Sequence, residues 1–283
     1  MIVLDRASLP PLLRAIHGPP LRLFLRGNGD PTLLTAPAVA IVGARACSPY
    51  GKQVARSLGR ELAAAGVVVV SGLARGIDSE AHRGALDAEG HTVAVLGCGI
   101  DRDYPAVHAP LARAIADRSL LVSEYEPGVE PAPWRFPARN RIIAGLCAAT
   151  VVVEARERSG ALITADFALE EGRDVFAVPG EITSCLSDGT NALLKLGAAP
   201  LTCVGDVLET LGIEASPRPA TLHPLLELLP ASVDELIRAS GLSSAEVAST
   251  LTELELAGAV AEGEGIYRRV PDALVGHVRP GHR

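Results

Sequence analysis

Aromatic residues are scarce in this sequence and make up 3% of its 283 residues. Any site that stacks bases on rings must therefore use very few of them. Basic charge is also in short supply, because the formal net charge is −7 at pH 7. This charge excludes a generally basic surface, so a nucleic-acid function requires a local basic patch.

Long apolar runs and paired cysteines are absent as well. The longest strongly apolar run, at residues 67–70, is far too short to cross a bilayer. The N-terminal residues have no apolar core of the kind found in signal peptides. The five cysteines are scattered, with no zinc-ligand or C-x-x-C spacing. We therefore expect a cytoplasmic protein without membrane contact, disulfides or a metal site.

From residue 39 onward, short apolar runs alternate with longer amphipathic stretches. The runs are continuously apolar, which predicts strands buried on both faces in a parallel sheet covered by helices. The predicted strands are 39–42, 67–70, 93–96, 120–122, 150–153 and 175–178. The predicted helices are 50–65, 79–88, 106–116, 161–171 and 190–196. This order predicts an α/β fold with an extended Rossmann-like, doubly wound, mostly parallel sheet.

Changes in composition divide the chain into four parts. A short N-terminal segment (1–36), with a predicted helix at 9–16 and strand at 21–25, precedes the Rossmann-like domain (37–211). Prolines and small polar residues at 212–221 indicate a linker. The remainder, 222–283, contains a small C-terminal winged-helix domain and a tail. Its predicted elements are helices at 222–229, 232–239 and 244–257, then a hairpin at 259–270.

The predicted winged helix has the wrong charge for duplex DNA. Its helix at 244–257, which occupies the recognition position, carries Glu246, Glu253 and Glu255 and no basic residue. Across 222–270, acidic residues outnumber arginines eight to three. We expect this module to bind protein rather than a duplex, and the same acidity argues against a transcription factor.

Glycines and arginines follow the first two predicted strands of the domain. Gly43 and Arg45 follow the first, and Ser48 and Gly51 open the next helix. Strand ends and helix starts meet at one edge of a doubly wound sheet, where backbone N–H groups attract anions. The spacing is neither G-x-G-x-x-G nor a P-loop, so no dinucleotide or ATP cofactor is expected. A turn glycine and a surface arginine are the alternative interpretation.

The second predicted strand ends in Ser71 and Gly72, followed by Arg75. Either Ser71 or Asp78 is predicted to cap the following helix, while Arg75 faces the same crevice. Asp78 and His82 also suggest an acid–base pair. We favour a cap and a packed histidine over that reading.

The densest basic cluster lies between residues 135 and 158. It contains two acidic residues, Glu154 and Glu157, and five arginines. The arginines are Arg135, Arg139, Arg141, Arg156 and Arg158. Asn140 and the neighbouring rings of Trp134 and Phe136 complete a set of residues that holds phosphates and stacks bases of a single strand. A solvated arginine loop with both rings in the core is the alternative.

The sixth predicted strand ends at Pro179-Gly180, and a helix containing Asn191 and Lys195 follows. Thr190 or Asp188 at its start is predicted to cap the helix. This segment alone leaves both a structural and a ligand-binding role open.

Taken in order, these segments resemble the DprA/Smf family across residues 39–198. The matching stretches are AIVGARACSPYG, VVVVSGLARGIDSEAHRGAL, VAVLGCGIDRDYP, LLVSEYEPG, FPARNRIIAGL, VVVEARERSGALITADFALEEGRDVFAVPG and DGTNALLKLGA. The resemblance implies a non-enzymatic homodimer that binds and protects single-stranded DNA. It also implies that the protein loads RecA recombinase onto incoming DNA during natural transformation.

The resemblance also assigns residues. Arg45 matches the DNA-contacting arginine of the family's G-x-R turn. The complete expected single-strand site is Gly43, Arg45, Ser48, Gly51, Ser71, Gly72, Arg75, Phe136, Arg139, Asn140, Arg141, Asn191 and Lys195. Two features depart from the family pattern. Residues 1–36 are too short for the family's SAM-like domain, and Ala106 replaces the lysine that follows the Tyr-Pro pair in some members.

A nucleotide-hydrolysing Rossmann enzyme of the phosphoribohydrolase type is the alternative function. Those enzymes use a P-G-G-x-G-T-x-x-E motif. Here Pro179-Gly180 is separated from Gly189-Thr190, and no glutamate follows at the required spacing. The catalytic carboxylate of that class is therefore missing.

Overall fold

The computed structural model describes residues 1–213, 224–256, 259–263 and 265–269. The chain divides into two units, Met1–Ile213 and Glu214–Arg283, which are treated separately below. Most of the predicted linker at 212–221 lies outside the described residues, as does the tail from residue 270 onward. No helix among the described residues is long and apolar enough to span a membrane.

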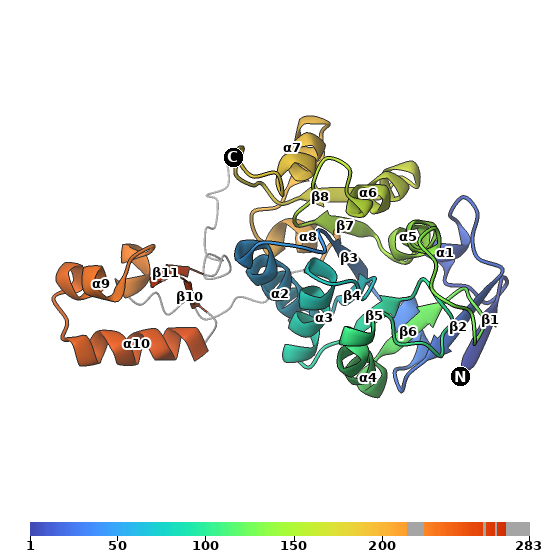
Figure 1. Ribbon diagram of the computed structural model, residues 1–283, viewed down its shortest axis with the longest axis horizontal. Helices are drawn as coiled ribbons and strands as arrows, with labels where there is room; N and C mark the ends of the chain where they lie inside the picture. Colours follow the sequence, from blue (N-terminus) through green and yellow to red (C-terminus); the bar gives the residue numbers. More distant parts are fainter. Residues whose placement is uncertain (214–223, 257–258, 264, 270–283) are drawn as a thin grey trace, which may run out of the picture. The chain divides into compact units, whose positions relative to one another are not determined.

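The first unit is built on a nine-stranded sheet with the order β1-β2-β6-β5-β4-β3-β7-β8-β9 (Figure 1). The strands are β1 (Ile2–Asp5), β2 (Arg22–Arg26), β3 (Ala38–Val42), β4 (Val68–Ser71), β5 (Thr92–Val95), β6 (Leu120–Ser123), β7 (Ala149–Val152), β8 (Asp174–Ala177) and β9 (Ala199–Pro200). β1 pairs antiparallel with β2, and β2 pairs antiparallel with β6. All pairings from β6 to β9 are parallel.

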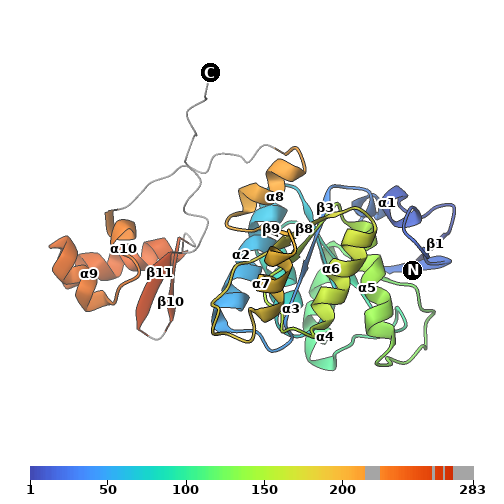
Figure 2. The same ribbon diagram turned by 90° about the horizontal axis from the view of Figure 1, so that it is seen from above.

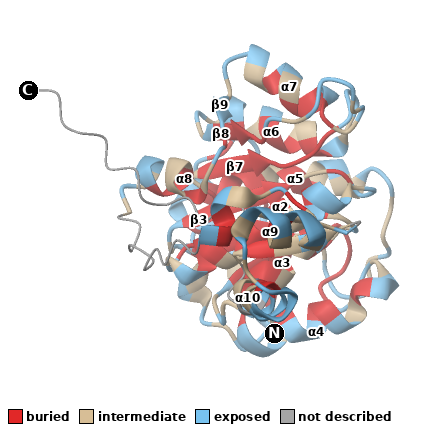
Figure 3. Cartoon of the chain, turned by 90° about the vertical axis from the view of Figure 1, so that its left-hand side faces the viewer, coloured by how far each residue is buried: buried red, intermediate tan, exposed pale blue. Residues whose placement is uncertain are grey.

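Helices cover both faces of this sheet (Figure 2). They are α1 (Pro11–Arg14), α2 (Pro49–Ala64), α3 (Ile77–Asp87), α4 (Ala109–Arg118), α5 (Arg135–Leu146), α6 (Gly160–Glu170), α7 (Asp188–Lys195) and α8 (Val204–Thr210). Alternate residues of β3 show the two layers. Ala40 and Val42 pack in a core with α1, α5, α6 and α7, whereas Val39 and Ile41 pack in a core with α2, α3 and α8. Burial on both faces is visible in the red strands of Figure 3.

The predicted fold class is confirmed, and all six predicted strands and five predicted helices of the domain are present. The strand predicted at 21–25 is β2, and the helix predicted at 9–16 is the shorter α1. Helix α5 was missed, because its arginines and Pro137 favoured a loop. Proline is tolerated in the first turn of a helix, where its missing N–H has no intrahelical partner, and Pro137 occupies that turn.

The order of the strands creates a switch point beside β3. The chain passes from β3 to β4, β5 and β6 on one side and then returns to place β7 on the other side. The helices that follow β3 and β7 therefore diverge to opposite faces of the sheet. In open α/β sheets, ligands bind in the crevice that opens at such a point.

The second unit has the elements of a winged helix. A 3₁₀ turn (Pro224–Leu228) precedes α9 (Val233–Ser240), α10 (Ser244–Leu256) and the hairpin of β10 (Val260–Gly263) and β11 (Ile266–Arg269). The first helix predicted at 222–229 is thus a 3₁₀ turn within its described part. Reciprocal hydrogen bonds between Ser232 and Glu235 cap α9, and Leu236, Val247 and Leu251 form the centre of the core.

His82 of α3 is fully buried and contacts Thr92 of β5. Thr92 Oγ1 donates its only hydrogen to Val69 O at 2.7 Å, so His82 Nδ1 must be the donor in its own 2.7 Å bond to Thr92 Oγ1. Among the described residues, nothing bonds to Nε2. Burial first, then the neighbouring His108, Arg139 and Arg83, lowers the pKa of His82 from 6.5 to about 3. The packed-histidine prediction is confirmed, and His82 is not paired with Asp78.

This buried histidine predicts acid sensitivity. Between pH 6.5 and about 3, the unfolded chain binds a proton at His82 that the folded protein excludes. The stabilisation is therefore complete above pH 6.5 and is lost as the pH falls, by roughly 1.4 kcal/mol per pH unit. In urea unfolding measured from pH 7 to pH 4, His82→Gln should show a shallower loss of stability than wild type. Parallel curves for the two proteins would contradict this account.

Candidate nucleic-acid interface

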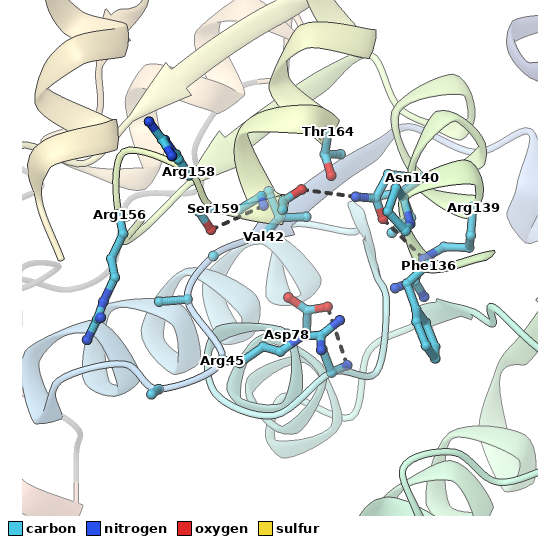
Figure 4. Close-up of a pocket in the computed structure, with 18 residues that line it drawn as sticks. Val42, Arg45, Asp78, Phe136, Arg139, Asn140, Arg156, Arg158, Ser159 and Thr164 are labelled. Carbon is cyan, nitrogen blue, oxygen red and sulfur yellow. Dashed lines mark hydrogen bonds between the residues drawn. The ribbon is translucent and has the colours of Figure 1, made fainter. Parts of the chain in front are cut away.

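A pocket of about 320 Å³ lies at the switch point, where the loops after β3 and β7 meet the starts of α5 and α6 (Figure 4). Gly43 and Arg45 come from the loop after β3, and Arg156 and Arg158 come from the loop after β7. The remaining polar side chains and the ring of its lining are Asp78, Phe136, Arg139, Asn140, Ser159 and Thr164. Four arginines thus face one carboxylate in a chain whose net charge is negative.

The N-terminus of α6 forms one wall of the pocket. Ser159 caps this helix by accepting a hydrogen bond from Ala161 N at 3.3 Å, and Gly160 leaves the backbone open to solvent. The first N–H groups of a helix have no intrahelical partners and carry the positive end of the helix dipole. This wall is therefore suited to a phosphate.

Asp78 and Arg139 are both buried, and both bind backbone. Asp78 accepts hydrogen bonds from Gly72 N at 3.1 Å and from Ala74 N at 3.4 Å. Arg139 Nη1 donates to Gly72 O at 2.8 Å and also to Val95 O. The two charges together hold the loop after β4 and tie it to the end of β5.

Burial shifts the pKa of each group in the direction that favours its uncharged form. It raises the pKa of Asp78, with Arg139 as the largest opposing influence. It lowers the pKa of Arg139 to about 10, with Asp78 opposing the change. A guanidinium with this pKa remains charged at neutral pH, so Arg139 keeps its hydrogen bonds to the strand ends.

The other three pocket arginines are exposed. Among the described residues, none of Arg45, Arg156 and Arg158 forms an ion pair with a carboxylate. The guanidinium carbon of Arg45 lies 5.6 Å from the centre of the Phe136 ring. Their positive charge is therefore available to a ligand, and a ring lies beside it.

Ser48 and Gly51 support the pocket from beneath the start of α2. Ser48 N donates to Glu154 Oε2 at 2.9 Å, and its hydroxyl donates to the same carboxylate while accepting from Gly51 N at 3.0 Å. A side chain at residue 51 would overlap Glu154. These contacts hold the loop after β3 against the end of β7, so they position Arg45.

The structure brings only some of the expected site residues together. Gly43, Arg45, Phe136, Arg139 and Asn140 line the pocket. The other expected residues lie outside its lining; they are Ser48, Gly51, Ser71, Gly72, Arg75, Arg141, Asn191 and Lys195. The binding role of all thirteen remains a prediction.

Several of the residues outside the lining have structural partners. Ser71 Oγ donates to Ile41 O at 2.6 Å between two strands, and Arg141 pairs with Glu124 at 2.6 Å. Asn191 exchanges hydrogen bonds with the backbone of Gly180 at 3.1 and 3.3 Å. Arg75 and Lys195 are exposed.

The predicted helix caps were wrong. The residue before α3 is Gly76, with no side-chain cap, because Ser71 bonds across the sheet and Asp78 bonds backward to its own loop. The residue before α7 is Ser187, also without a side-chain cap. Thr190 Oγ1 instead donates to Ser187 O at 3.1 Å.

The expected site omitted the α6 wall and the two arginines before it. Arg156 and Arg158 were grouped with the basic cluster but not with the binding residues. The signal was the Ser159-Gly160 pair directly before a predicted helix and after a predicted strand. Among the described residues, no group of three or more His, Cys, Asp and Glu side chains is arranged to hold a metal.

Comparison with known proteins agrees with this architecture. Residues 1–212 match the family described as DNA recombination-mediator protein A, and residues 209–265 match the DprA winged helix domain. The chain belongs to the DprA/Smf family of DNA recombination mediators. DNA processing protein DprA of Streptococcus pneumoniae is 50% identical over 69% of this chain and 68% of the relative. Protein Smf of Escherichia coli is 40% identical over 99% and 79%.

Two solved structures of DprA proteins share the fold. The S. pneumoniae protein has a TM-score of 0.70 at 44% identity, covering 77% of this chain and 75% of that one. DNA processing protein A from Helicobacter pylori has a TM-score of 0.68 at 34% identity, covering 74% and 94%. The latter structure concerns the single-stranded DNA binding mode of the H. pylori protein.

Arg139 is buried and bonded to the backbone, whereas Arg45 is exposed, so a lysine should affect stability differently at the two positions. Lysine cannot reproduce the fork with which Arg139 reaches two strand ends, so Arg139→Lys should lower the free energy of unfolding by about 2–4 kcal/mol. Arg45→Lys should leave it within about 0.5 kcal/mol of wild type, because that side chain is exposed. Denaturant unfolding measures both. Wild-type stability for Arg139→Lys would show that the buried bonds contribute little.

Proposed function

We propose that this protein binds single-stranded DNA at the switch-point pocket and acts there as a recombination mediator. One observation carries the proposal. Three exposed arginines without ion pairs among the described residues surround an open helix N-terminus and a ring, in a protein of net negative charge. Arginine forks and backbone N–H groups bind phosphate oxygens, and the ring provides a surface for a base.

A single strand suits this pocket better than a duplex. Phe136 lines the pocket beside Arg45, and a base can stack on a ring only when its own face is not covered by the neighbouring base pairs of a duplex. Proteins that read a duplex insert a protruding helix or β-ribbon into its major groove, whereas this site is a pocket. The H. pylori relative, whose single-stranded DNA binding mode has been described, supports the same choice of ligand.

We further propose that the chain acts by binding rather than by catalysis. The P-G-G-x-G-T-x-x-E motif of the phosphoribohydrolases is missing from the sequence. Gly189, at the position where that motif would continue, packs against the backbone of Ala155 and Arg156, which leaves no room for a Cβ. Gly189 therefore supports the loop after β7.

Family membership supports three further proposals about partners. We propose that the protein is a homodimer, that it loads RecA onto the DNA it binds, and that it serves natural transformation. The winged helix is proposed to bind protein, because the exposed described residues of α10, Glu246 and Glu255 among them, include no basic side chain. A helix of this charge is unsuited to the phosphates that flank a major groove.

Binding of a fluorescent oligo-dT, followed by anisotropy at two salt concentrations, tests the main proposal. Arg45→Ala should weaken binding by about 1–3 kcal/mol, because a charge-assisted phosphate contact is lost. It should also reduce the slope of log Kd against log salt by about 0.7, the value expected for one phosphate contact in a single strand. Arg113→Ala, which removes an exposed arginine of α4 outside the pocket lining, is the matched control.

Three outcomes contradict the proposal. Wild-type binding that is absent, or insensitive to salt, would exclude a phosphate-binding pocket. Release of free base from a nucleoside monophosphate would instead support the hydrolase alternative. Equal losses from Arg45→Ala and Arg113→Ala would show that the charge of the whole surface, not the pocket, binds DNA.

A further inference from the structure

Four of the nine aromatic residues in this chain gather at one edge of the sheet, although aromatics are scarce. They are Tyr104, Tyr125, Trp134 and Phe136. Each follows or faces the carboxyl end of a strand: Tyr104 lies in the loop after β5, Tyr125 follows β6, and the other two open α5. The carboxyl edge that holds the pocket at β3 and β7 therefore continues as a row of rings towards β6.

The row begins inside the pocket. Phe136 lines the pocket, and its ring stacks on Tyr104 with centres 5.3 Å apart and planes inclined by 24°. Arg45 lies over the same ring of Phe136. A cation and two rings thus lie together where the proposed strand is held.

A second layer lies beside the first. The guanidinium carbon of Arg135 is 4.6 Å from the centre of the Trp134 ring and 5.1 Å from that of Tyr125. Arg135 also donates to the backbone oxygen of Glu130. The indole of Trp134 remains 63% exposed despite these contacts. Trp134 therefore presents a large ring that is held by a cation and remains open to a ligand.

Each carboxylate near this layer pairs with an arginine other than Arg135. Glu124 pairs with Arg141 at 2.6 Å, Glu126 with Arg22 at 3.7 Å, and Glu130 with Arg102 at 2.7 Å. None of the ion pairs among the described residues includes Arg135, and its buried Nε has no hydrogen-bond partner there. The positive charge of the layer is therefore not cancelled by a direct carboxylate partner.

We propose that Trp134, Arg135 and Tyr125 form a second base-stacking platform, on which an unpaired nucleobase lies against the indole of Trp134. This inference rests on the proposed binding of single-stranded DNA. The pocket holds one phosphate, and the strand then follows the carboxyl edge so that a neighbouring base covers Trp134. Because every base has a flat aromatic face, the platform accepts all four bases, and a duplex, whose bases already stack on one another, does not use it.

The proposal can be tested by tryptophan fluorescence, because Trp134 is the only tryptophan in the chain. Titration of oligo-dT into the full-length protein should quench its fluorescence, with a midpoint equal to that of the anisotropy curve. Trp134→Ala should weaken oligo-dT binding by about fivefold to 100-fold, as expected for one stacked base. Trp134→Phe should recover part of that loss, since the ring remains.

Four control measurements separate stacking from charge and from misfolding. An abasic oligonucleotide of equal length should bind wild type and Trp134→Ala equally, and the salt slope of Trp134→Ala should match wild type. Leu21→Ala, which removes another apolar side chain that is 75% exposed, should bind as wild type. Trp134→Ala should also unfold at the same denaturant concentration as wild type.

The outcomes distinguish this inference from the function on which it rests. DNA binding by anisotropy without fluorescence quenching, and with wild-type affinity for Trp134→Ala, overturns the platform but leaves the pocket. A Trp134→Ala variant that binds DNA normally but no longer binds RecA makes the surface a protein site, and it also overturns the platform. No binding of DNA by wild type overturns both proposals.

Discussion

The shape of the pocket depends on two buried charged side chains whose hydrogen bonds are made to the backbone rather than to a ligand. Asp78 accepts hydrogen bonds from the N–H groups of the loop after β4, and Arg139 donates to the carbonyl oxygens that end β4 and β5. Backbone groups at the ends of parallel strands would otherwise be buried without partners, which is costly. Because each charge has hydrogen-bond partners, the loop after β4 is held in place beside the pocket without a ligand.

This arrangement explains how an acidic protein can have a site for an anion. Arg139 holds the framework, while the exposed Arg45, Arg156 and Arg158 keep their charge free of ion pairs among the described residues. The start of α6 adds backbone donors on the opposite wall. The pocket therefore combines three exposed cations with backbone donors, which suits it to an anion despite the negative net charge of the chain. The acidic winged helix lies in a separate unit.

The sequence predicted the fold better than the site. Continuous apolar runs predict buried parallel strands, because both faces of such strands must be covered. The arginine-rich start of α5 did not show a helical pattern, and Arg139, expected to contact DNA, has its guanidinium bonded to strand ends. Partners distant in sequence were also invisible: Ser48 and Glu154 are 106 residues apart and meet only because β3 and β7 are neighbours. Glycine and arginine at strand ends nevertheless indicated the edge of the sheet at which the pocket lies.

The central claim is that single-stranded DNA lies along the carboxyl edge of the sheet in the first unit. Photocrosslinking of an oligonucleotide containing 5-iododeoxyuridine, followed by mass spectrometry of the linked peptides, tests this location most directly. The account predicts linked peptides that contain the start of α5, with Phe136 as the principal site. Crosslinks confined to α9, α10 and their hairpin would contradict it and would place the DNA on the winged helix.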